Sequence, residues 1–178
     1  ALVMETTDDL IGQAQNPTTL AAINGFSLAW RTLGGEQTEQ LQTSYITNNT
    51  FPAGQRDNMD SIGDGSQYDL VHTKFHPYYR TVLQNGGYYD LFLVDADGNV
   101  IYSVFKETDY ATNLNTGPWR DTDLAEAFRA ASDLPEGETA FMDFQSYAPS
   151  ENAPAGFVST PVMKGDALRG VLIYQLHK

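Results

Sequence analysis

The chain has 178 residues, and it lacks cysteine, is poor in basic residues and has no long apolar run. Without cysteine, a disulfide framework, a thiol nucleophile and a thiolate metal site are all impossible. Lysine and arginine total 10 against 23 Asp and Glu, a formal net charge of -13. Such a surface repels nucleic-acid phosphates and anionic lipids, which excludes both as partners. No stretch reaches the roughly 20 apolar residues of a membrane span, and no basic signal peptide opens the chain.

The composition nevertheless supports a folded core, because 41% of the residues are hydrophobic and 12% are aromatic. The first part of the chain has helical patterns. Asn16 followed by Pro17 predicts a helix N-terminus, and Gly34 and Gly35 predict its end. We expect helices over residues 4–15, 17–33, 38–47 and 67–87, the last restarted at Pro77, with a loop over 48–66.

From residue 88 onward the pattern becomes strand-like, rich in aromatic and β-branched residues. The predicted strands are 88–95, 99–106, 138–147, 154–166 and 168–177, with an amphipathic helix over 121–133. This order predicts an α+β fold with a five-stranded antiparallel sheet and a helical N-terminal layer. We divide the chain into a helical region, 1–65, and a sheet domain, 66–178.

One sequence pattern resembles a calcium loop but does not fit one. Asp95, Asp97 and Asn99 occupy the first, third and fifth positions of such a loop. However, Val100 stands where glycine is needed, and Lys106 stands where the bidentate glutamate belongs. We therefore interpret these residues as a hairpin turn.

Two further patterns suggest chemistry without supporting it. Ser103–Lys106 has the S-x-x-K spacing of penicillin-recognising enzymes, but it lies in a predicted strand and the partner motifs are absent. His72 and His76 could bind a metal from one helix face, but Pro77 interrupts the helix there, and helix capping is the simpler interpretation. We expect no catalytic residues, no metal and no cofactor, and hence no enzyme.

The predicted hairpin of residues 87–110 is mostly apolar, yet outside its turn it also carries the charges Asp90, Lys106, Glu107 and Asp109. Strand alternation places Asp90 with Phe92 on one face and Leu91 on the other, and it groups Tyr102, Val104 and Lys106. One face can form core while the other, with aromatic rings and a few polar groups, lines a small-molecule pocket. The candidate ligand-binding residues are Tyr79, Arg80, Tyr89, Asp90, Tyr102, Lys106, Asp143, Tyr147, Phe157 and Ser159.

Asp143 is a notable candidate because it stands between Phe141 and Phe144 in a predicted strand. A buried carboxylate needs a cation or several hydrogen-bond donors, so we expect Lys106, Arg80 or a ligand amine to meet it. The alternative for each of these charged and tyrosine side chains is that it lies at a strand end and reaches water.

The runs GYYDLFLVDADGNVIYSVFKETDYATNL, FMDFQSYAPS, PAGFVSTPV and GVLIYQL together resemble the extracytoplasmic single Cache (PAS-like) sensor domain of bacterial methyl-accepting chemotaxis receptors and related transmembrane signal transducers. The resemblance covers roughly residues 66–178. It implies a PAS-like sheet in the periplasm, held by flanking membrane helices that are absent here, with a long membrane-proximal helix before it. It also implies a small polar ligand, chiefly a short carboxylate of the acetate, pyruvate or lactate class, with urea or an amine as alternatives.

On that basis we expect a periplasmic sensor in which Lys106 or Arg80 binds the carboxylate and the ligand shifts the N-terminal helix. Pairing of such helices would give a homodimer. Leu20, Ile23, Leu28 and Trp30 either form that interface or pack on the chain's own sheet. The rival function is a ligand-free PAS-like dimerisation module of a histidine kinase or cyclase; a hydrolase using Ser103 is a third.

Overall fold

The computed structural model describes residues 2–178, with side chains from Glu5 onward. The helices are α1 (Leu2–Ala14), α2 (Pro17–Thr32), α3 (Gln37–Gln42), α4 (Gln67–Gly86) and α5 (Asp123–Ser132). The strands are β1 (Asp90–Asp95), β2 (Val100–Ser103), β3 (Ala140–Tyr147), β4 (Ala153–Lys164) and β5 (Ala167–His177). A π-helical turn η1 (Thr43–Thr47) and two 3-10 turns, η2 (Arg56–Asn58) and η3 (Ala148–Ser150), complete the elements.

Helix boundaries largely follow the capping signals in the sequence. Asn16 caps α2 by accepting a hydrogen bond from the backbone N–H of Thr18, with Pro17 at the first helical position. Ser66 caps α4 in the same way, and Gly87 ends that helix with a left-handed φ of 69°. The predicted break in this helix was wrong, because α4 runs through Pro77 without interruption.

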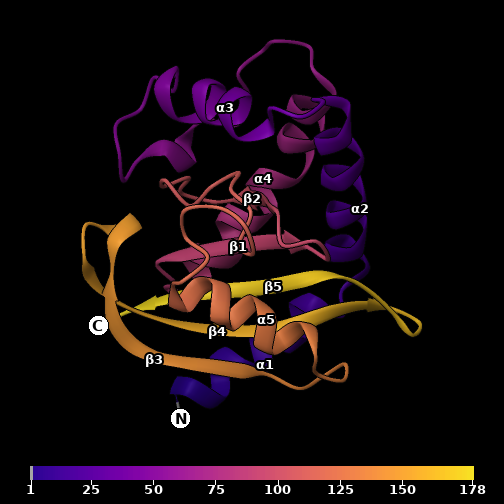
Figure 1. Cartoon of the computed structure of the whole chain (residues 1–178), viewed down its shortest axis with the longest axis vertical. Coiled ribbons are helices and arrows are strands. Elements are labelled where there is room, and N and C mark those ends of the chain that lie inside the picture. The colour runs from indigo at the N-terminus through magenta and orange to yellow at the C-terminus, as the bar shows by residue number, and fades with distance from the viewer. Residues whose placement is uncertain (1) are drawn as a thin grey trace.

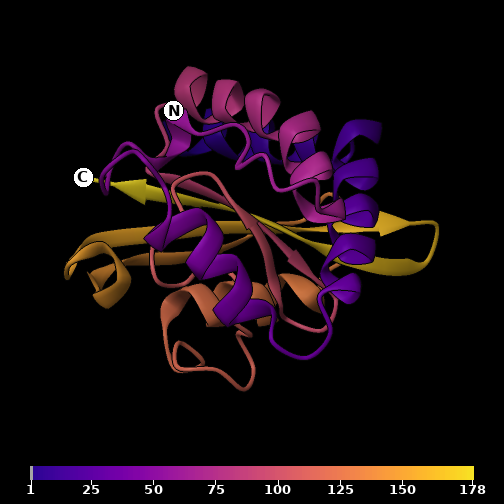
Figure 2. The same ribbon diagram turned by 90° about the horizontal axis from the view of Figure 1, so that it is seen from above.

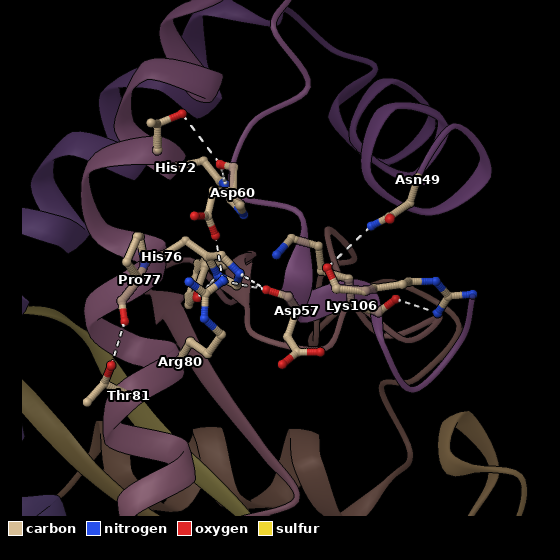
Figure 3. Close-up of polar contacts among 12 residues, drawn as sticks. Asn49, Asp57, Asp60, His72, His76, Pro77, Arg80, Thr81 and Lys106 are labelled. Atoms are coloured by element: carbon tan, nitrogen blue, oxygen red, sulfur yellow. Dashed lines mark hydrogen bonds and ion pairs between the residues drawn. The ribbon is translucent and has the colours of Figure 1, made fainter. Parts of the chain in front are cut away.

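The continuity of α4 has a packing cause. Residues on both sides of Pro77 are buried against the rest of the protein, including Phe75 and Tyr79. The lost backbone hydrogen bond is therefore offset by tertiary contacts, which local propensity does not report. After the proline, the Thr81 hydroxyl donates to the Pro77 carbonyl at 3.0 Å (Figure 3).

The five strands form one antiparallel sheet in the order β2-β1-β5-β4-β3, which confirms the predicted α+β class (Figure 1). The second strand is shorter than predicted. It ends at Ser103 because the chain turns there, and Lys106, predicted within the strand, lies beyond it with a left-handed φ of 56°.

Each face of the sheet has its own core. Figure 2 shows α4 and α1 on one side of the sheet and α5 on the other. On the helical face, Leu91 and Leu93 of β1 pack with residues of α2 and α4. On the α5 face, Phe92 and Val94 pack with residues of α5. The predicted alternation of β1 is therefore confirmed.

The N-terminal helices share the helical-face core. Ile23 is 1% exposed and Trp30 is 8% exposed, so both pack within the chain itself, whereas Leu28 is 59% exposed. Of the two interpretations of these apolar residues, packing on the protein's own core holds for Ile23 and Trp30. No helix in the described part of the chain, residues 2–178, is long and apolar enough to cross a bilayer.

Candidate functional site

Asp90, one of the charged residues of the central hairpin, has a structural role in the turn after β2. It opens β1, is 0% exposed, and accepts hydrogen bonds from the backbone N–H groups of Leu91 at 2.8 Å and Phe105 at 3.1 Å. The Ser103 hydroxyl donates to it at 3.1 Å. Asp90 thus fixes the turn that ends β2, and this turn determines where the next residues point.

The strand register aligns Asp90 with other side chains on the α5 face. Asp90 is opposite Gln175 of β5, and Gln175 is opposite Phe157 of β4. Residues directly opposite across strands share a face with Cβ atoms about 5 Å apart. The ring of Tyr147, at the end of β3, meets the Phe157 ring edge-on at 5.0 Å. A row of one carboxyl group, one amide and two rings therefore crosses the sheet.

The chain after β2 adds two more carboxyl groups to this row. Asp109 is 0% exposed, and its Oδ2 accepts the Tyr147 hydroxyl hydrogen bond at 2.8 Å. Glu107 accepts from the hydroxyls of Tyr89 at 2.8 Å and Ser150 at 2.7 Å. We call Asp90, Glu107 and Asp109 the acidic cluster.

Two buried acceptors, Asp109 Oδ1 in the cluster and Gln175 Oε1 beside it, have no hydrogen-bond partner among the described residues. Gln175 is 1% exposed and uses its amide N–H to donate to the Ser150 hydroxyl at 2.9 Å, so its oxygen is free to accept. The ion pairs recorded within residues 5–178 are Arg80–Asp60 and Arg129–Glu126, and neither involves the cluster. The described residues thus leave two buried acceptors, one in the acidic cluster and one beside it, without a donor.

Burial and mutual repulsion alter the acidity of the cluster. Desolvation, reinforced by the nearby Glu107, raises the pKa of Asp90 to about 7. Desolvation and the charge of Asp90 raise the pKa of Asp109 well above its usual range. Burial also raises the pKa of Glu107, although hydrogen bonds from Ser150 and Tyr89 oppose it. Both effects disfavour the ionised form of a carboxyl group.

The Lys106 ammonium lies on the helical face of the sheet, among tyrosine rings of that core. Its Nζ donates to the Ser103 carbonyl at 2.8 Å and lies 5.0 Å from the ring centroid of Tyr102. The rings of Tyr45 and Tyr110 lie at 5.8 and 5.6 Å. Desolvation lowers the pKa of this fully buried lysine to about 7. The cation is therefore held by aromatic faces and one carbonyl rather than by a carboxylate.

The two histidines of α4 take structural roles beside Lys106 (Figure 3). His72 Nδ1 lies 2.8 Å from the Asp60 carbonyl and His76 Nε2 lies 2.7 Å from the Asp57 carbonyl, so both of these nitrogens carry a proton. His76 Nδ1 then accepts from the Tyr102 hydroxyl. Burial lowers the pKa of His76 to about 2 and that of His72 well below its usual value. Within residues 5–178, no group of three His, Asp or Glu is placed to hold a metal.

Other predicted site residues lie away from the acidic cluster. The Tyr79 hydroxyl donates to Thr19 at 2.8 Å inside the helical-face core. Arg80 binds the Asp57 carbonyl and the Asp60 carboxylate (Figure 3). Ser159 is buried on β4, where its hydroxyl donates to the Ala127 carbonyl of α5 at 2.7 Å.

The expectation for Asp143 was wrong. Asp143 is exposed on the edge strand β3, and its carboxylate accepts from the adjacent Phe144 N–H. It meets neither Lys106 nor Arg80. An edge strand has no neighbour on one side, so flanking phenylalanines do not by themselves bury a residue.

The structure therefore gathers Tyr89, Asp90, Tyr147 and Phe157 of the predicted residues, and separates Tyr79, Arg80, Tyr102 and Lys106 from them. Sequence reasoning missed four contributors to the site: Glu107, Asp109, Ser150 and Gln175. The signal for two of them was visible, because Glu107 and Asp109 are charges in an apolar hairpin. A polar Gln175 within the apolar run of the last strand was the third signal.

The burial of Lys106 among tyrosine rings leads to a prediction about the stability of the fold. We expect Lys106→Met to leave the fold as stable as the natural protein or more stable by about 1 to 3 kcal/mol, since methionine fills similar space without a buried charge. Chemical unfolding monitored by circular dichroism measures this. A loss above about 2 kcal/mol would show that the cation–π contacts outweigh the cost of desolvation.

Comparison with known proteins found no matching family model and no similar curated protein. Similar solved structures are sensor domains of chemoreceptors and histidine kinases. The sensor domain of the V. cholerae histidine kinase DctB is 15% identical over 90% of this chain and 57% of that one, with a TM-score of 0.46. The sensory domain of the Campylobacter jejuni chemoreceptor Tlp3 with isoleucine bound is 13% identical over 99% of this chain and 61% of that one, with a TM-score of 0.44.

A third similar structure is the ligand-binding domain of the Pseudomonas fluorescens chemoreceptor CtaA with L-serine. It is 13% identical over 88% of this chain and 55% of that one, with a TM-score of 0.38. The present chain thus spans less than two thirds of each of these structures.

Proposed function

We propose that the chain is the extracytoplasmic ligand-binding domain of a membrane receptor, and that its ligand is a small organic cation or amide donor such as a primary amine or urea. The observation that carries this proposal is the pair of buried acceptors, Asp109 Oδ1 and Gln175 Oε1, that have no partner in the described residues. Buried polar groups are nearly always hydrogen-bonded, so these two oxygens favour a ligand that brings N–H donors.

The charge of the site supports the same ligand class. Asp90 and Asp109 are both 0% exposed, and no basic side chain of residues 5–178 forms an ion pair with them. A ligand ammonium would supply the missing positive charge and gain charge-assisted hydrogen bonds worth about 1.5 to 3 kcal/mol each. The rings of Tyr147 and Phe157 provide an apolar wall beside these groups.

A short carboxylate, the ligand class expected from the sequence, fits this site less well. It would meet Asp90, Glu107 and Asp109, and like charges repel. The basic groups that were expected to bind it have other partners. Arg80 forms an ion pair with Asp60, and the Lys106 ammonium lies over the ring of Tyr102. One observation still favours the carboxylate: within residues 5–178 the Lys106 ammonium has one hydrogen-bond acceptor, the Ser103 carbonyl.

Signalling would follow from the shared core. The helical-face core joins α2 and α4 to β1 and β5. A ligand that favours one arrangement of the sheet would shift the N-terminal helices by about 1 to 2 Å, and with them a membrane segment attached to the receptor. Leu28 on α2 and Leu70 on α4 are exposed apolar residues of these helices that are available to a second copy in a homodimer.

A thermal-shift panel tests the ligand class. We expect ethylammonium, putrescine or urea to raise the melting temperature by mass action, and acetate, pyruvate and lactate to leave it unchanged. Asp109→Asn should abolish the shift, while Asp143→Asn, which removes an exposed carboxylate on β3, should retain it. If only the carboxylates raise the melting temperature, and Lys106→Met abolishes that increase, the ligand site lies at Lys106 instead. A flat panel would favour a ligand-free dimerisation module.

A further inference from the structure

Ionisation of the acidic cluster is unfavourable even when no ligand is bound. Two of its carboxyl groups, Asp90 and Asp109, are completely buried, and both also face the half-buried Glu107. An ionised carboxylate removed from water needs a cation or several hydrogen-bond donors close by, and otherwise it binds a proton.

The charged and titratable groups that face the cluster come from every element packed around it. They are Asp90 of β1, Tyr102 of β2, Lys106, Glu107 and Asp109 of the chain after β2, Tyr89 before β1, Tyr147 of β3, Glu151 after η3 and Arg56 of η2. The two basic groups among them are committed to backbone oxygens. Lys106 Nζ donates to the Ser103 carbonyl, and the Arg56 guanidinium donates to the Lys106 carbonyl at 2.9 Å.

The hydrogen bonds of Asp109 leave room for a proton. Its Oδ2 accepts from the Tyr147 hydroxyl, while its Oδ1, which has no partner in residues 5–178, can carry a proton and donate it. The buried Gln175 Oε1 is an unpaired acceptor on the same face of the sheet. A neutral Asp109 therefore suits this environment better than an ionised one.

We propose that the ligand-free acidic cluster holds protons in place of a cation, so that cation binding beside Asp109 and Gln175 expels protons and makes the sensor respond to acidity as well as to its ligand. This inference rests on the proposed function for its second half, because the cation is the proposed ligand. Its first half, proton storage at Asp109, depends only on the chain's own residues. Acidification would then weaken ligand binding by competition.

The direct test is carboxyl NMR of the protein labelled with ¹³C at the aspartate side-chain carboxyl. The Asp109 signal is assigned as the one missing in Asp109→Asn. We expect it to stay at the position of a protonated acid at about pH 6 and to titrate above the ordinary aspartate range. Tyr147→Phe provides a second variant. It removes a hydrogen bond that favours the ionised form, so the Asp109 titration should move to still higher pH.

Ligand coupling is tested with ethylammonium chloride at about pH 6 in an unbuffered, pH-stat titration. We expect release of about one proton for each cation bound, together with a shift of the Asp109 signal to the ionised position. Asp143→Asn is the matched control and should release the same number of protons. An Asp109 signal that is already ionised at this pH without the amine, or amine binding without proton release, would overturn the proposal. A protonated Asp109 that ethylammonium leaves unchanged would refute the proposed ligand class and, with it, the expulsion of protons.

Discussion

Asp109→Asn is expected to become progressively more stable than the natural protein as the pH rises. Asparagine has nearly the shape of a protonated aspartic acid and can still accept the hydrogen bond that Tyr147 donates to Asp109. It cannot ionise, so it avoids the cost of a buried carboxylate. We expect the two proteins to differ little at about pH 4, and the advantage of the variant to grow above that by about 1.4 kcal/mol for each pH unit over which the folded carboxyl group keeps its proton.

The sign follows from proton linkage. Burial raises the pKa of Asp109 in the folded state above the value of 3.8 that describes it unfolded. Above that value the unfolded chain releases its proton while the folded protein retains it, so the stability contributed by this group declines with rising pH. The decline ends only when the folded carboxyl group ionises too. Asparagine does not titrate, so the difference in free energy of unfolding between the two proteins reports the pH-dependent contribution of Asp109 alone.

The comparison with a variant is necessary because other groups also titrate in this range. His72 and His76 are buried with lowered pKa values, so below about pH 6.5 they favour the unfolded chain and oppose the effect of the acidic cluster. These terms cancel when the variant and the natural protein are measured at the same pH. Urea unfolding at each pH supplies the free energies. With Asp143→Asn the difference should stay constant, and a constant difference for Asp109→Asn would exclude a raised pKa.

Phe26→Ala is expected to destabilise the whole protein by about 3 to 5 kcal/mol. Phe26 lies on α2 and is 0% exposed. Its ring packs within 5.3 Å of Tyr68 on α4 and 5.1 Å of Tyr102 on β2, measured between ring centroids. Truncation would leave a cavity where the first helices meet the sheet, and the close-packed rings around it can collapse only partly.

The same variant tests the proposed division of the chain at residue 65. Because the helical-face core includes residues of both regions, we expect one cooperative transition in which helical and aromatic signals change together. Leu28→Ala is the matched control. It lies on the same helix but is 59% exposed, so its effect should stay within about 0.5 kcal/mol. Two separate transitions, with only the helical one shifted by Phe26→Ala, would show that residues 1–65 unfold as an independent unit.

Patterns local in the sequence were sufficient for most of the elements and for the fold class. The cap formed by Asn16 and Pro17 and the left-handed glycine at 87 each depend on a few neighbouring residues. The alternation of Leu91 with Phe92 likewise follows from backbone geometry alone. Local signals failed at Pro77, where tertiary burial kept α4 continuous, and at Lys106, where a turn ended the strand.

The candidate site depended on the tertiary structure, because its members are distant in the chain. The sequence by itself determined that Asp90, Glu107 and Asp109 are charges in an apolar hairpin, and it determined no partner for them. Only the register of β1 against β5 brought Gln175 opposite Asp90. Only the position of β3 at the sheet edge exposed Asp143, since burial depends on which strand lies alongside and not on the neighbouring residues in the sequence.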